Sequence, residues 1–176
     1  MRRALLLIST VALLALPATA SAFPKDRTWA TINVCDTDGR QNSIGVRAGM
    51  PGSTKADRMY MQFVLQYYDV KKARYLSLAP PSTWVDAGSA GFRFAQRGFD
   101  FLKIADPPAG ARFKYRALVR FEWRDVRRVG GRKREVVVRS AKRVTRGGLK
   151  GVPGGEPRGR SDAVCVVRGA DVPPPA

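Results

Sequence analysis

Few side chains in this chain are of the types that carry out catalysis. It has no histidine, which removes the commonest general base, the Ser-His-Asp triad and most zinc sites. Asp36 and Asp38 precede Gly39 as in a calcium loop, but the later ligands do not follow, so a plain turn is the better interpretation. The sequence therefore predicts no catalytic residue, cofactor or metal. A carboxylate-based hydrolase stays open as the least favoured function, because the 14 acids are scattered and two of them could meet in space.

Two cysteines, Cys35 and Cys165, each lie in a short strand-like segment. In an exported chain an even number of cysteines predicts a disulfide, here one that joins the first strand of the domain to its last. Two free buried thiols are the alternative.

Positive charge is the strongest chemical feature of the chain. It has 32 Lys and Arg against 14 Asp and Glu, a formal net charge of +18. Fourteen of the basic residues lie between positions 112 and 146. From 112 to 125 apolar and polar residues alternate, which predicts a β-strand with one dry and one wet face. Its wet face would carry Arg112, Lys114, Arg116, Arg120 and Arg124.

A second strand is predicted to return over residues 135–145, after the turn at Gly130 and Gly131. If Val136, Val138 and Val144 point inward, then Lys133, Arg139 and Arg143 point outward. Adjacent strands lie about 4.8 Å apart, so these three residues would share one face with the five basic residues of the first strand. The eight together form a candidate polyanion-binding face.

This basic surface has two interpretations. The plain one is a solvated face in an arginine-rich proteome, since the abundance of Arg, Ala, Gly, Val and Pro is typical of a GC-rich bacterial genome and arginine stems can cover apolar surface. The more specific one is a docking surface for a cell-wall polymer, an acidic polysaccharide or another anionic surface. No aromatic residue interleaves with the outward basic residues of the two strands, so base stacking is not expected.

Residues 1–22 have the pattern of a secretory signal peptide. Arg2 and Arg3 precede an apolar stretch, and Ala20-Ser21-Ala22 forms a small-x-small cleavage site. A membrane anchor is the alternative, but the apolar stretch is short for a span of about 20 residues. The sequence therefore predicts a secreted or extracellular protein, with association with the cell surface as an open alternative, whose mature chain does not span a membrane.

Beyond the signal, short strand-like segments alternate with Gly and Pro turns, and no helical period of useful length occurs. The spacing predicts an all-β fold, an antiparallel β-sandwich of about seven to eight strands over residues 23–172. The predicted strands include 31–35, 43–46, 59–68, one or two within 91–104 interrupted at Gly98, and 163–167. Residues 147–161 are predicted to form a flexible loop rich in Gly, Pro and Arg, and residues 173–176 a Pro-rich tail.

The stretch from Leu102 to Trp123, with the turn at 107–110 and the segment 115–120, resembles the corner before the penultimate strand of immunoglobulin-like and fibronectin type III domains. The resemblance implies such a sandwich in a small exported bacterial protein, with no catalytic residues. It implies that Tyr115 packs inward and hydrogen-bonds across the corner, and that Trp84 is the buried core tryptophan. The chain departs from these families in its length and in the wide separation of its cysteines.

Together these observations predict a secreted, non-catalytic binding or structural module. Polyanion binding through the basic hairpin face is the alternative, with an anionic polymer or cell-surface component as the partner. A secreted hydrolase is the second alternative. Nothing in the sequence indicates a small-molecule substrate.

Overall fold

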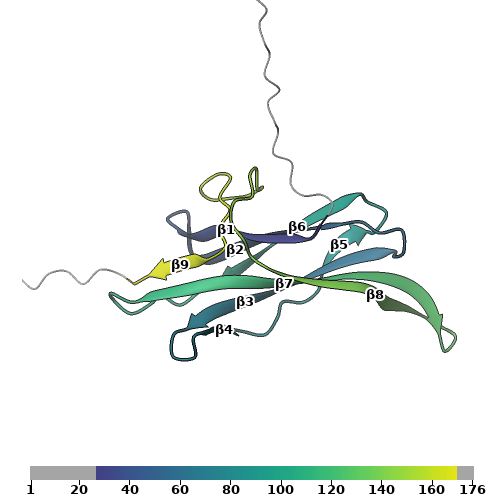
Figure 1. Cartoon of the computed structure of the whole chain (residues 1–176), viewed down its shortest axis with the longest axis horizontal. Helices are drawn as coiled ribbons and strands as arrows, with labels where there is room; N and C mark the ends of the chain where they lie inside the picture. The colour runs from purple at the N-terminus through teal and green to yellow at the C-terminus, as the bar shows by residue number, and fades with distance from the viewer. Residues whose placement is uncertain (1–26, 170–176) are drawn as a thin grey trace, which may run out of the picture.

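The computed structural model describes residues 27–169, which form two antiparallel β-sheets packed face to face (Figure 1). The smaller sheet has the order β1-β2-β6, with the bounds β1 Trp29–Thr37, β2 Arg40–Pro51 and β6 Phe94–Leu102. The larger sheet is centred on β3 (Arg58–Asp69) and β7 (Arg112–Val129). Its β3 edge pairs with β4 (Arg74–Ser77) and β5 (Val85–Ser89), and its β7 edge pairs with β8 (Arg132–Val144) and β9 (Cys165–Arg168).

The predicted fold class is confirmed: the described chain is all-β and sandwich-like, with nine strands instead of seven to eight. β2 and β6 differ from the predicted strands. β2 extends well beyond 43–46, and β6 continues through Gly98, which pairs with Arg47 instead of interrupting the strand. The predicted signal peptide (1–22) and the Pro-rich tail (173–176) lie outside the described residues.

β7 is the strand that fixes which face of the larger sheet is buried. Its odd-numbered side chains from Tyr115 to Trp123 are all buried, while the even-numbered ones between them are half-exposed. This is the period of two that the sequence shows. β3 pairs with β7 over Arg58–Tyr67 and contributes its own odd-numbered residues to the same buried face.

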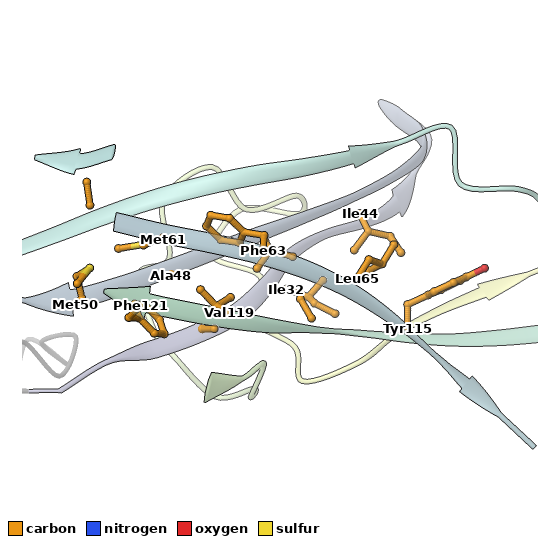
Figure 2. Packing of buried hydrophobic residues seen from close by; sticks show 14 of the residues in the cluster. Ile32, Ile44, Ala48, Met50, Met61, Phe63, Leu65, Tyr115, Val119 and Phe121 are labelled. Carbon is orange, nitrogen blue, oxygen red and sulfur yellow. The ribbon is translucent and has the colours of Figure 1, made fainter. Parts of the chain in front are cut away.

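The core lies between the two sheets (Figure 2). Met61, Phe63 and Leu65 of β3 and Val119 and Phe121 of β7 meet side chains of the smaller sheet there. Those side chains come from β1 and β2 and include Ile32, Ile44, Ala48 and Met50. Each of these residues is 3% exposed or less, so the sandwich has one continuous hydrophobic core.

The predicted disulfide between Cys35 and Cys165 is confirmed, with the two Cα atoms 5.4 Å apart. Cys35 lies on β1 of the smaller sheet and Cys165 on β9 of the larger sheet, so the bond ties the two layers together. Both residues are buried. The bond closes a loop of 130 residues, nearly the whole described domain.

The predicted loop at 147–161 runs along the free edge of β1. Ile32 and Asp162 exchange both of their backbone hydrogen bonds, at 2.9 Å each, and the backbone N–H of Glu156 donates to the carbonyl of Asn33. The side-chain amide of Asn33 donates in turn to the carbonyl of Gly154 at 2.8 Å. These bonds occupy backbone groups that would otherwise leave β1 an open strand edge.

Two residue roles implied by the family resemblance are wrong. Trp84 is not the buried core tryptophan, because Trp29 and Trp123 are 1% and 0% exposed while Trp84 is half-buried outside the core. Tyr115 does pack inward, but its hydroxyl makes no hydrogen bond to any described residue, so no hydrogen-bonded tyrosine corner forms. Figure 2 shows this hydroxyl pointing away from the core cluster.

Candidate functional site

The outer face of the larger sheet, the side that carries the even-numbered side chains of β7, contains most of the predicted basic residues. Arg112, Lys114, Arg116, Arg120 and Arg124 lie there, as the alternation along β7 requires. Lys133 is directly opposite Arg128 in the β7–β8 register and therefore shares this face. Six of the eight predicted residues thus lie on one surface.

The other two, Arg139 and Arg143, lie on the opposite side of the sheet. Arg139 is directly opposite Trp123 and Arg143 is directly opposite Val119, and both of these partners point inward. The guanidinium carbon of Arg139 lies 4.3 Å from the centroid of the Trp123 ring. Both arginines remain exposed, but they do not belong to the predicted face.

Arg139 and Arg143 were assigned to the wrong face because the β7–β8 pairing contains a β-bulge between Trp123 and Arg124. The register moves there from Trp123↔Arg139 to Arg124↔Val137, which leaves Val138 as an extra residue. An extra residue inverts the inside-outside alternation on one side of the bulge relative to the other. On β8, the residues that precede Val138 therefore point as predicted. Beyond Val138 the alternation is inverted, so Val144 and Lys142 lie on the outer face, where they pair with Leu118 and Arg120.

Aromatic rings also lie on this outer face, contrary to the expectation of no aromatic interleaving. Arg116 lies over the ring of Tyr75, with 3.9 Å from the guanidinium carbon to the ring centroid. Arg124 lies 4.2 Å from the Tyr60 centroid and 5.0 Å from that of Trp84. The rings come from β3, β4 and the segment before β5, all of which precede the β7–β8 hairpin in the sequence. A cation over an aromatic face gains about 0.5–1 kcal/mol at an exposed site.

Negative charge neutralises the part of the outer face around Arg124. Arg124 forms ion pairs with Glu122 at 2.8 Å and with Glu135 at 3.3 Å, and the hydroxyl of Tyr60 donates to Glu135 at 2.7 Å. Burial lowers the pKa of Arg124, but the hydrogen bonds to Glu122 and Glu135 outweigh it and raise the pKa. Burial, together with the bond to Glu135, also raises the pKa of Tyr60. The charge of Arg124 is therefore already paired with carboxylates of the same sheet.

The middle of the outer face keeps its positive charge. Arg116 donates through Nε to the side-chain oxygen of Gln66 at 2.9 Å, and Arg120 donates through Nη1 to that of Gln62 at 3.2 Å. Both partners are neutral amides, and within residues 27–169 neither arginine forms an ion pair. The Nε of Arg120 is buried and has no hydrogen-bond partner there. Arg116 and Arg120 are thus two oriented, half-buried cations with no counter-charge in the described part of the chain.

A pocket of about 300 Å³ opens next to Arg120 on this face. Trp84 forms one side of it, β7 contributes Arg120 and Glu122, and β8 contributes Ser140 and Lys142. Its lining is evenly mixed between polar and apolar surface. Trp84, Ser140 and Lys142 were not among the predicted site residues.

A larger pocket, of about 450 Å³, lies at the end of the sandwich where β3 turns toward β4. Tyr67, Leu78, Phe113 and Tyr115 give it a mainly apolar lining, with Arg112 near the outer face. Burial raises the pKa of Tyr115 here. Asp69 and Lys71 are the other charged residues of its lining.

The acidic turn at the β1–β2 connection is built as a turn. The side chain of Asp36 accepts a hydrogen bond from the backbone N–H of Asn42 at 2.7 Å. Within the described part of the chain, no group of three or more Cys, Asp or Glu side chains is placed to hold a metal ion. In that same part, no helix is long and apolar enough to cross a membrane.

Comparison with known proteins gives no family for this chain: no protein-family model matches it, and no curated protein matches it significantly.

Proposed function

We propose that this chain is an exported, non-catalytic binding module whose ligand is a polyanion held on the outer face of the larger sheet. The disulfide and the signal-like segment at 1–22 support export. The immunoglobulin-like or fibronectin type III-like identity of the sandwich stays a prediction. The assignment of a ligand rests on local geometry and not on the fold, since sandwiches of this kind have many functions.

One observation carries the proposal: Arg116 and Arg120 are oriented by neutral partners, and neither pairs with a carboxylate among residues 27–169. A surface arginine that only improves solubility keeps its guanidinium free in water. Here Gln66 and Gln62 hold the two guanidinium groups in place. Pre-oriented arginines lose less side-chain entropy when they bind an anion, and a guanidinium can engage a carboxylate, sulfate or phosphate through two hydrogen bonds at once.

The surrounding charges favour the same ligand. Lys142 is directly opposite Arg120, and Arg112 and Lys114 continue along β7. Charges on an exposed surface are screened over about 8 Å at physiological ionic strength. Binding to this face is therefore expected to weaken steeply as salt is added, as for other polyanion contacts.

Heparin chromatography with a salt gradient tests the proposal. The double variant Arg116→Gln/Arg120→Gln removes two positive charges from the outer face, and we expect it to elute at clearly lower salt than the wild type. The matched control, Arg134→Gln/Arg143→Gln, removes the same charge from two exposed residues that do not lie on the outer face. Both are directly opposite odd-numbered residues of β7. We expect this control to elute close to the wild type.

Equal shifts in the two double variants would contradict the proposal. Retention would then follow net charge alone, as expected for a solvated basic surface. Retention that does not depend on salt would also contradict it. Circular dichroism melting curves of both variants establish that neither result reflects loss of the fold.

A further inference from the structure

The pocket beside Trp84 adds a feature that attraction to a polyanion does not require. A flat basic surface would attract any polymer of negative charge. This pocket places an indole, two cations, a carboxylate and a hydroxyl around a space of about 300 Å³. That volume is at the lower end of those that hold small ligands, about 300–1,000 Å³.

Two cations lie side by side in the pocket. Arg120 and Lys142 are directly opposite each other on β7 and β8, and both line the pocket. Like charges at directly opposite positions of an antiparallel pair destabilise the sheet. Neither residue has an ion pair in the described chain, and the buried Nε of Arg120 lacks an acceptor. An anionic group between the two side chains would relieve both the repulsion and the missing hydrogen bond.

The other lining groups restrict what carries that anion. Trp84 lines the pocket, and the face of its ring that does not lie against Arg124 suits the C–H face of a sugar ring. Glu122 and Ser140 supply hydrogen-bond acceptors that suit sugar hydroxyls. The Glu122 carboxylate, although paired with Arg124, disfavours a second anionic group inside the pocket itself, whereas a sulfated chain such as heparin can still bind along the rest of the outer face. The lining therefore favours a ring with one negative charge and several hydroxyl donors.

We infer that the pocket binds one carboxylate-bearing sugar ring of an acidic polysaccharide, with the sugar carboxylate between Arg120 and Lys142 and the ring against Trp84. This inference rests on the proposed function and specifies the class of its ligand. It also distinguishes the middle of the outer face from the hairpin tip, where Lys133 contributes charge but does not line this pocket.

Titration calorimetry with oligogalacturonate tests the inference, with the methyl-esterified oligosaccharide as the matched ligand. We expect the free acid to bind at least tenfold more tightly than the ester. The variant Lys142→Gln should lose about tenfold in affinity, whereas Lys133→Gln, an equal charge change on the same face, should lose less than twofold. Trp84→Ala should also lose about tenfold, with Trp84→Phe retaining most of the affinity.

Lys142 is exposed, so its variant keeps the test decisive if Trp84→Ala does not fold. Equal affinity for acid and ester, or equal losses for Lys142→Gln and Lys133→Gln, would overturn the inference. Tighter binding of polyphosphate, DNA or phosphatidylglycerol vesicles, unaffected by Trp84→Phe and Lys142→Gln, would also overturn it. In each of these cases the heparin comparison of Arg116 and Arg120 still decides the proposed function separately.

Discussion

Removal of the Cys35–Cys165 disulfide is expected to destabilise the domain more than any surface substitution. The bond closes a loop of 130 residues, and the chain-entropy model assigns a loop of that length about 5 kcal/mol. Native domains are stable by about 5–15 kcal/mol, so the loss is a third of the total or more. At about 2–4 °C per kcal/mol for a domain of this size, Cys35→Ala/Cys165→Ala should melt about 10–20 °C below the wild type.

The assay is urea and thermal unfolding followed by circular dichroism, on the double variant and on the wild type with and without reductant. The reduced wild type should behave like the double variant. We also expect a larger dependence of the unfolding free energy on urea, because the uncrosslinked chain exposes more surface when it unfolds. A loss below about 1 kcal/mol would refute the reasoning, because the two sheets would then be held together by the core alone.

Three further predictions follow from the core, the tyrosines and the outer face. Phe63→Ala should cost about 3–5 kcal/mol in urea unfolding, because Phe63 is 0% exposed and stacks on Phe99 at 5.5 Å; a loss below about 1 kcal/mol would contradict this packing. Burial raises the pKa of Tyr115, and burial with the Glu135 bond raises that of Tyr60, so both should ionise above about pH 10 in an ultraviolet titration. The stability that the un-ionised Tyr60 and Tyr115 contribute is therefore fully present below about pH 10, and it is lost as the pH rises through their folded pKa values. Ionisation of every tyrosine in one step near pH 10 would contradict this prediction. Glu135→Gln frees part of the charge of Arg124 and should move heparin elution to higher salt than the control Asp38→Asn, an exposed acid at the β1–β2 turn; equal elution would contradict it.

The sandwich and its central strand could be predicted because their signal is local. In β7 the alternation from Tyr115 to Trp123 is unbroken, and each odd position is buried as the pattern requires. The disulfide could be predicted because the chain has two cysteines, which allow one intramolecular pairing, and because a predicted exported protein favours the oxidised state. Strand ends were less predictable, as at β2, where residues with no alternating pattern are held in the strand by pairing with β6.

The candidate site could be predicted only in part, because it is assembled from strands far apart in the sequence. Arg116 and Gln66 are 50 residues apart, and the ring of Tyr75 reaches Arg116 only because β4 folds back on β3. No sequence pattern marks the bulge at Val138, so Arg139 and Arg143 could not be assigned to a face from alternation alone. The basic face of β7 can be predicted from the sequence, whereas the aromatic partners and the pocket depend on how the strands pair.

Nuclear magnetic resonance of the arginine Nε–H groups, recorded during titration with oligogalacturonate, tests the central claim most directly. We predict that the Nε–H signals of Arg116 and Arg120 shift first and furthest, with that of Arg120 gaining protection from exchange, while those of Arg139 and Arg143 stay in place. Shifts of equal size in all four signals, or shifts confined to Arg139 and Arg143, would contradict a ligand site on the outer face of the larger sheet.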